Sequence, residues 1–321
     1  MNKEESLDNL GTFTKSSPRS AKASACGKAI IVGEHAVVYG SHAVAMPLKQ
    51  MRMDLELNPQ PSSLSGPKYQ LKLGGKELSE RISGVIPEAL TLLKQNPYSL
   101  TIKGHSSLPI GAGLGSSATL CIATLKSICG SMGLDLSRDD IAYLGNQLEA
   151  RFHGNPSGLD TAVVAYEECV YFAKGDPIQS IKATSPGKWH FALIDSKIRA
   201  STLAMIRIAE PFFRGPQGDE RIERFDLAAK LVKNSLHSEN YGAVAEAMNE
   251  CGSLLRQAGV VPDSIEEMLE ACRKTEILAA KTTGAGGGGT ILCLLDPDKW
   301  ESQVKDLQQT FSDYPVFHIQ I

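Results

Sequence analysis

The sequence predicts an α+β fold, because strand patterns dominate its first half and helical patterns dominate much of its second. Apolar and polar residues alternate over residues 51–57, which is typical of a strand with one buried face. Residues 201–274 are largely helical, and strands at 290–295 and 316–321 close the chain. Runs of strands followed by runs of helices favour an α+β architecture over a doubly wound parallel sheet.

The length of the chain predicts two domains. At roughly 150 residues per domain, 321 residues correspond to about two. We expect a flexible polar tail over residues 1–22, an N-terminal domain over 23–188 and a C-terminal domain over 189–321.

Composition excludes several classes of protein. Hydrophobic residues make up 42% and charged residues 21%, so we expect a packed core. A net charge of −3 and an aromatic content of 6% argue against a nucleic-acid partner. The seven cysteines are odd in number and none are separated by two residues, so we expect free buried thiols rather than a zinc site. The sequence shows neither an apolar run long enough to span a membrane nor a secretory signal, so we expect a cytoplasmic enzyme.

The elements of the first half follow from local patterns. A short apolar run predicts a strand over residues 28–32, and alternation over 69–73 predicts another before a Gly-Gly turn. Apolar residues at helical spacing predict a helix from Ala118 onward. Ser137 and Asp140 form a capping-box pattern before a further helix that ends near Gly154.

The second half begins with a predicted strand over residues 190–195. The helical region that follows is broken by Gly215-Pro216 and again over residues 259–262. Glycine and proline at these positions predict separate helices rather than one long helix.

A glycine-rich segment near the middle of the chain carries the strongest chemical signal. Its glycines permit positive φ and close approach of the backbone to a ligand. Several backbone N–H groups and two hydroxyls at the start of a helix are suited to bind a polyphosphate. The spacing matches neither a Walker A loop nor a Rossmann turn, and a simple helix start is the alternative. The candidate residues are Pro109, Gly111, Ala112, Gly113, Leu114, Gly115, Ser116, Ser117 and Ala118.

A second glycine-rich run occupies residues 284–289, where five of the six residues are glycine. Such a backbone forms neither a stable helix nor a stable strand, so it makes a tight turn or lies against another surface. A flexible linker is the alternative. The apolar residues that follow at 291–295 favour a run anchored to a core strand.

Two carboxylates are candidates for proton transfer and metal binding. Asp160 follows a constrained Pro-Ser-Gly turn, where it could accept a proton from an alcohol or cap a helix. Glu149 lies at the edge of an apolar helical stripe, where a solvated charge is the commoner role. Beside Asp160 and a phosphate loop, Glu149 becomes a candidate Mg²⁺ ligand.

Three polar residues flank the first predicted strand. Lys28 opens it, and Glu34 and His35 close it. Lys28 could activate an attacking hydroxyl or neutralise a carboxylate, and a solvated strand end is the alternative. On composition alone, we expect His35 to bond a loop carbonyl rather than a substrate.

Together and in this order, these segments resemble the motifs of the GHMP kinases, which include galactokinase and the homoserine, mevalonate and phosphomevalonate kinases. Residues 28–38, with the core Gly-Glu-His-Ala-Val-Val, resemble the mevalonate kinase form of motif one. Residues 109–118 resemble motif two, 281–289 motif three and 153–160 the catalytic segment. Order and length agree over about residues 22–321.

The resemblance implies an ATP-dependent kinase that phosphorylates the C5 hydroxyl of (R)-mevalonate. Another GHMP kinase, acting on a sugar, homoserine or phosphomevalonate, is the alternative. A non-catalytic ATP sensor is disfavoured because the candidate base, lysine and metal ligand are all present. The implied fold is a nucleotide-binding N-terminal domain related to ribosomal protein S5 domain 2 and a ferredoxin-like α+β C-terminal domain.

The resemblance also implies a role for each candidate residue. Asp160 would be the base beside Lys28, and Ser117 and Glu149 would hold Mg²⁺, while residues 109–118 would wrap the phosphates of ATP. The expected partners are ATP and mevalonate, with no nucleic acid and no membrane, and a homodimer is one possible assembly. The implied substrate contacts are Glu34, His35, Thr202, Gly284, Ala285 and Gly286.

The chain departs from the family pattern in two places. Motif one usually reads Pro-Gly-Lys, and here Cys26 stands in place of the proline, which frees one φ angle but removes no chemistry. In a later loop the family places Pro-Arg before Asn-Thr, whereas here Arg199 lies one position early. Arg199 and Lys197 are therefore both candidates to anchor the substrate carboxylate.

Overall fold

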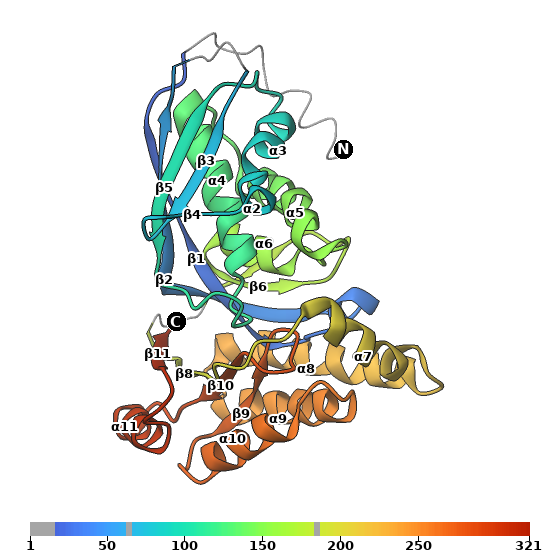
Figure 1. Ribbon diagram of the computed structural model, residues 1–321. Coiled ribbons are helices and arrows are strands. Elements are labelled where there is room, and N and C mark those ends of the chain that lie inside the picture. Colours follow the sequence, from blue (N-terminus) through green and yellow to red (C-terminus); the bar gives the residue numbers. More distant parts are fainter. Residues whose placement is uncertain (1–16, 62–65, 183–186) are drawn as a thin grey trace.

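Two β-sheets form the framework of the molecule, which we describe from a computed structural model for residues 17–61, 66–182 and 187–321 (Figure 1). Within these ranges one sheet has seven strands in the order β4-β3-β5-β2-β6-β7, with β1 paired to β2, and the other has four in the order β11-β8-β10-β9. Helices cover both sheets, so the α+β fold class is confirmed.

The N-terminal part contains the larger sheet and the helices packed on it. Its elements are β1 (Ala21–Val32), η1 (Ala36–Tyr39), β2 (Ala43–Pro59), β3 (Tyr69–Leu73), β4 (Lys76–Glu77), α2 (Glu80–Ser83), α3 (Val85–Leu92), β5 (Leu100–Ser106), α4 (Ser116–Met132), α5 (Arg138–His153), α6 (Leu159–Tyr166), β6 (Cys169–Phe172) and β7 (Gln179–Ile181). The helices α4, α5 and α6 lie together on one side of this sheet (Figure 1).

The C-terminal part contains the smaller sheet and the remaining helices. Its elements are β8 (His190–Asp195), α7 (Thr202–Arg214), α8 (Gly218–Ser238), α9 (Tyr241–Gln257), α10 (Asp263–Arg273), β9 (Ala279–Thr283), β10 (Thr290–Leu294), α11 (Trp300–Thr310) and β11 (Val316–Gln320). All three strand pairings are antiparallel. If the four strands are numbered by their order in the chain, their order across the sheet is 4-1-3-2, which is the order of a ferredoxin-like sheet.

The smaller sheet is covered on both faces, because successive side chains of its strands point to opposite sides. Phe191 and Leu193 of β8 pack with residues of α8 and α9, whereas Ala192 and Ile194 pack with α10 and α11. The first face joins the same apolar cluster as β1 and β2 of the larger sheet. The core is therefore continuous across the boundary expected at residue 188.

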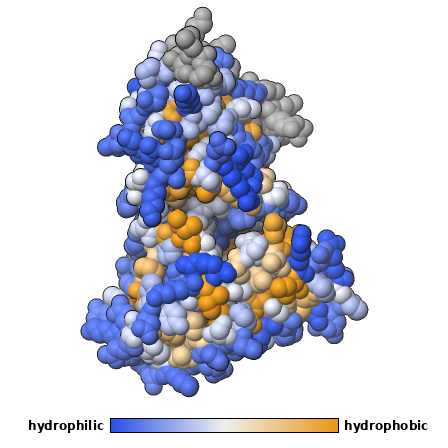
Figure 2. Space-filling view, viewed as in Figure 1, coloured by the Kyte–Doolittle hydropathy of each residue, from blue (hydrophilic) through white to orange (hydrophobic). Residues whose placement is uncertain are grey.

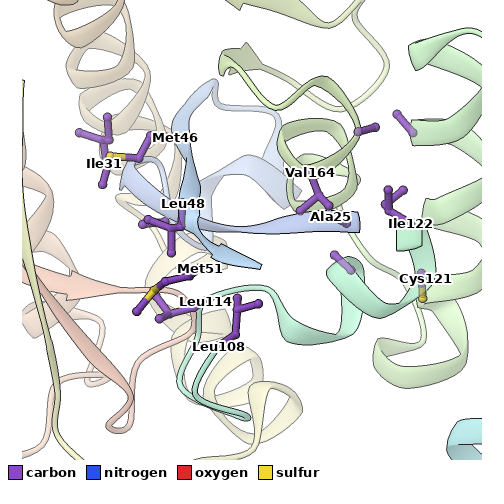
Figure 3. Close-up of a cluster of buried hydrophobic side chains, with 14 of the residues drawn as sticks. Ala25, Ile31, Met46, Leu48, Met51, Leu108, Leu114, Cys121, Ile122 and Val164 are labelled. Carbon is purple, nitrogen blue, oxygen red and sulfur yellow. The ribbon is translucent and has the colours of Figure 1, made fainter. Parts of the chain in front are cut away.

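The apolar residues of the middle glycine-rich segment anchor that segment to the core. Figure 3 shows Leu108 and Leu114 beside Met51 of β2, and Leu114 is buried to 1% exposure. Burying a leucine side chain contributes about 1.5–3 kcal/mol. The loop is therefore held in one conformation by its own leucines, while its glycine backbone stays free to face a ligand.

Several local predictions are confirmed and two boundaries are wrong. The capping box of Ser137 and Asp140 is present at the start of α5. Strand β1 begins at Ala21, so the last two residues assigned to the tail belong to a strand. Residues 1–16 lie outside the described residues. Strand β2 begins at Ala43, eight residues before the alternation starts, because both faces of its first six residues are buried.

All seven cysteines are free, as expected, and six of them are buried. Burial raises the pKa of the Cys26 thiol to about 11, so the residue that replaces the family proline stays a neutral, apolar side chain. Within the described ranges, none of the helices is both long enough and apolar enough to cross a membrane.

Candidate functional site

A cavity of about 460 Å³ brings the candidate residues together between the two sheets. Its walls are formed by residues of β1, the middle glycine-rich segment, α5, the start of α6, the start of α7 and the second glycine-rich run. In Figure 2 the molecule narrows between its upper and lower parts, and apolar side chains gather on this face around the narrowing. The predicted residues that line the cavity are Lys28, Glu34, His35, Gly111, Gly113, Gly115, Ser116, Ser117, Glu149, Asp160, Thr202, Gly284 and Ala285.

Five candidate residues lie outside the lining of this cavity. Ala112, Leu114 and Ala118 are buried in the core, where they support the loop from behind. Gly286 packs on Val260, whose carbonyl oxygen would lie only 2.4 Å from a Cβ at that position. Pro109 precedes the part of the loop that reaches the cavity. These residues shape the site without facing it.

The two glycine-rich segments touch each other through their backbones. A Cβ at Gly113 would lie 2.9 Å from the carbonyl oxygen of Thr283, and one at Gly284 would lie 3.1 Å from the Cα of Gly113. Both glycines have positive φ, at 82° and 91°. Any side chain would therefore force the segments apart as well as strain the backbone. The linker interpretation of residues 284–289 is excluded, because this run is part of the cavity wall.

A buried lysine and an aspartate form the charged centre of the cavity. The Nζ of Lys28 lies 3.1 Å from Oδ2 of Asp160 and also donates to the carbonyl oxygen of Gly113 at 3.1 Å. Lys28 is only 2% exposed, so it is not a solvated strand end. Asp160 lies in the first turn of α6, and its side chain is 29% exposed. The carboxylate is thus both held by a cation and open to a ligand.

Beside this pair, Ser117 links α4 to two side chains of α5. Its hydroxyl donates to Oε1 of Glu149 at 3.0 Å and lies 3.0 Å from Nε2 of His153. Glu149 is 2% exposed, which contradicts the solvated alternative. Burial, and then the nearby charge of Asp160, raise the pKa of Glu149 to about 8. Burial lowers the pKa of His153, which favours a neutral imidazole.

These oxygens fit a magnesium ion that is shared with phosphates. The carboxylate of Glu149 is buried and costs free energy to ionise, and it lies beside a hydroxyl. Within the described residues neither group contacts a lysine or arginine, and the neighbouring His153 favours its neutral form. A hard divalent cation would complete this donor set. No group of three or more His, Cys, Asp or Glu side chains in the described ranges is placed to hold a metal alone. Any ion here would therefore need further oxygen ligands, such as those of a bound phosphate or of water.

The residues that close the first strand face the second glycine-rich run. Nε2 of His35 bonds the carbonyl oxygen of Ala285 at 2.8 Å, so the ring donates there and the carbonyl prediction is confirmed. Burial lowers the pKa of His35, which keeps the ring neutral. Glu34 forms a buried ion pair with Lys281 of β9. The backbone N–H of Ile30 bonds the hydroxyl of Thr283 at 2.8 Å and completes this junction.

Neither cation proposed for the substrate carboxylate lines the cavity. Arg199 makes two bonds to Asp195, at 2.7 and 2.8 Å, and a third to the carbonyl oxygen of Ile110. Lys197 bonds the carbonyl oxygen of Asp313. The lysine and arginine residues that do line the cavity are Lys28 and Arg81.

Sequence reasoning gave no role to several polar residues in or beside the cavity, among them His153, Lys281 and Arg81. His153 was part of the recognised catalytic segment but received no role, and its spacing of four residues from Glu149 on one helix was the available signal. Lys281 opens motif three, where nothing in the sequence separates a buried lysine from an exposed one. Arg81 lies in a short helix far from every motif.

The comparisons with known proteins agree with this arrangement. Residues 83–168 match the GHMP kinases N terminal domain, and residues 228–313 match the GHMP kinases C terminal domain. A mevalonate kinase of Methanothermobacter thermautotrophicus is 31% identical over 278 residues, which cover 85% of this chain and 89% of the relative. One of Thermococcus onnurineus is 28% identical and covers 86% and 89%.

Among solved structures, the fold is similar to that of L. major mevalonate kinase in complex with R-mevalonate. That comparison has a TM-score of 0.80 at 20% identity and covers 97% of this chain and 99% of the other. At this identity it bears on the fold alone. The sequence matches over most of both chains carry the assignment further: the chain belongs to the GHMP kinase family, in the branch of the mevalonate kinases.

Proposed function

We propose that this chain transfers the γ-phosphoryl group of ATP to the C5 hydroxyl of (R)-mevalonate, giving 5-phosphomevalonate and ADP. The observation that carries the proposal is the contact of 3.1 Å between Lys28 and Asp160 in a cavity that the phosphate-binding loop also lines. Phosphoryl transfer requires mainly alignment of the reactants and neutralisation of charge, and this cavity provides groups for both. The relatives named mevalonate kinase support mevalonate as the acceptor.

Asp160 is suited to receive the proton of the attacking hydroxyl. Its carboxylate is partly exposed, so an alcohol can reach it, and Lys28 fixes its position. The same ammonium group would stabilise the alkoxide as negative charge develops on the oxygen. The bond from Lys28 to the carbonyl oxygen of Gly113 also ties this centre to the loop that would hold the phosphates.

Ser117 and Glu149 are the residues that would hold Mg²⁺. When bound, the ion would neutralise part of the phosphate charge. His153 offers an acceptor for the Ser117 proton when the hydroxyl oxygen is turned towards a cation. The positive φ of Gly111, Gly113 and Gly115 gives the phosphates access to the backbone at the start of α4.

The acceptor would lie between the first strand and the second glycine-rich run. Glu34, Ala285 and Thr202 face this region directly, and His35 offers Nδ1 because its Nε2 is engaged. Gly284 lets the second glycine-rich run lie close to Gly113, and Gly286 packs behind this wall on Val260. Because Arg199 and Lys197 are paired elsewhere, we expect the substrate carboxylate to be bound by backbone and hydroxyl groups rather than by either of them.

Turnover with a panel of acceptors tests the proposal. The chain is assayed with ATP and Mg²⁺ against mevalonate, phosphomevalonate, homoserine and galactose, with ADP release as the readout. We expect kcat/KM for mevalonate to exceed every other value by at least about 100-fold, since a site built to bond specific hydroxyls discriminates strongly. A higher value for any other acceptor would replace mevalonate with that substrate.

A further inference from the structure

A buried ion pair joins the two domains beneath the cavity, and the proposed mechanism does not use it. Lys281 is fully buried at 0% exposure and Glu34 at 1%. Nζ of Lys281 donates to Oε1 of Glu34 and to the carbonyl oxygen of Thr282 at 2.7 Å. The lysine belongs to β9 of the smaller sheet, whereas the glutamate follows β1 of the larger one.

The second oxygen of this carboxylate has no partner. Oε2 of Glu34 is buried and makes no hydrogen bond within the described residues, although Glu34 belongs to the cavity wall. Leaving a buried acceptor unsatisfied costs about 1–3 kcal/mol, and more when it is charged. Native proteins rarely keep such a group without a reason. A hydroxyl of a bound ligand would satisfy it if ligand binding turns this enclosed oxygen towards the cavity.

Lys281 is the main group that favours the charged form of this carboxylate. Burial raises the pKa of Glu34, and the charge of Lys281 opposes that rise. The other titratable groups that act on Glu34 are Lys28 of β1, which favours the charged form, and Cys251 of α9, whose thiol has a raised pKa and stays neutral. Without Lys281, the burial of Glu34 would favour its protonated form.

We propose that Lys281 is a positioning residue for the acceptor: it holds Glu34 ionised in the cavity wall, where the free oxygen accepts a hydrogen bond from the acceptor hydroxyl that is not phosphorylated. The reacting hydroxyl would lie at Asp160, so Glu34 would accept a hydrogen bond from a second hydroxyl of the same molecule. The acceptor is thus an alcohol with at least two hydroxyls. This inference rests on the proposed function, because it assumes that the acceptor occupies this side of the cavity.

The test compares Lys281→Met with the matched control Thr282→Val in the full chain. Thr282 is the next residue of β9, and its buried hydroxyl has no hydrogen-bond partner among the described residues. Its replacement by valine keeps the backbone carbonyl that Lys281 bonds, so it alters the same strand without removing a bond of the pair. In Lys281→Met we expect kcat/KM for the acceptor to fall by about 100-fold or more, while KM for ATP changes by less than about twofold. We expect Thr282→Val to retain both values.

A pH profile separates positioning from simple loss of structure. With Lys281 removed, Glu34 must ionise without its partner, so kcat/KM for the acceptor should rise with pH over a range where the wild type is flat. The double variant Lys281→Met with Glu34→Gln removes both charges and keeps an amide oxygen as acceptor. We expect it to fold as the wild type does, to lose the pH dependence and to recover at least about tenfold over Lys281→Met.

Three outcomes would overturn the inference. They are an equal loss for acceptor and ATP, an unchanged pH profile, and a double variant no better than the single one. The wild-type chain is assayed first, and absence of turnover with mevalonate would count against the proposed function instead. The Lys281 comparison is then made with whichever acceptor of the panel the chain does phosphorylate, so the two failures remain distinct.

Discussion

Replacing Glu149 with glutamine should stabilise the metal-free protein while it abolishes turnover. The carboxyl group is 2% exposed, accepts one hydrogen bond from Ser117 and lies near the charge of Asp160. These surroundings favour its neutral form, yet a magnesium ligand must be ionised. Glutamine has nearly the same shape, and its oxygen can keep the bond from Ser117. The substitution therefore removes the titration and leaves the packing in place.

The size of the effect follows from the raised pKa. The pKa of Glu149 is about 8 in the folded chain, against an ordinary value of 4.5. Below the lower value both states are protonated, and the group does not affect stability. Between the two values the unfolded chain loses its proton and the folded chain keeps it, so the free energy of unfolding falls by about 1.4 kcal/mol per pH unit. This penalty reaches up to about 3 kcal/mol at pH 7 and stops growing above the folded pKa.

Urea unfolding in the presence of a chelator, at pH 5 and at pH 8, measures this penalty. We expect Glu149→Gln to gain stability relative to the wild type by about 2 kcal/mol or more between these two conditions. The same substitution at Glu246, which is exposed on α9, serves as the control and should show no such gain. Parallel pH dependence in wild type and Glu149→Gln would refute the claim that this carboxyl is forced towards its neutral form.

Two further substitutions test the site from other sides. Asp160→Asn should lower kcat by about 10²–10⁴-fold, because it removes the proton acceptor, while ATP binding measured by calorimetry persists; near-normal turnover would remove Asp160 from the mechanism. Gly284→Ala should raise KM for ATP and lower thermal stability, because the new methyl group meets Gly113 at 3.1 Å and the residue has a φ of 91°. Gly133→Ala is its control, since that glycine also has positive φ but nothing near it. Equal effects of the two alanines would show that backbone strain, not contact between the loops, explains the loss.

The sequence alone predicted strands that show a clear alternation or a short apolar run. The alternation over residues 69–73 matches β3, and the apolar run over 190–195 matches β8. It missed two segments in which both faces are covered and the alternation is lost. The first six residues of β2 and all five residues of β9 are buried, so their side chains carry no alternating pattern.

The residues of the candidate site could also be predicted only in part. Glycine spacing predicted the turn that leads into α4, because its backbone conformation requires glycine. Whether Lys28 and Glu149 are buried could not be predicted from their own neighbours. Lys28 is covered by the loop that contains Gly115, and Glu149 by the start of α4, both distant in sequence. Burial of a charge is a tertiary property, so a local pattern can only propose it.

The buried charges of the cavity lower the stability of the fold, and this cost supports a functional role for them. Lys28, Glu149, Glu34 and Lys281 are each no more than 2% exposed. Apolar residues of similar size would often stabilise such a core better, since desolvation of buried charges can exceed the gain from pairing them. The pairs link segments more than 100 residues apart, so they are not by-products of a local motif. A fold keeps such groups when a ligand completes them, and the ligands we propose are a cation at Glu149, a hydroxyl at Glu34 and a reacting alcohol at Asp160. Binding ADP with Mg²⁺ and a non-reacting acceptor should therefore raise the melting temperature by more than the sum of the two separate shifts.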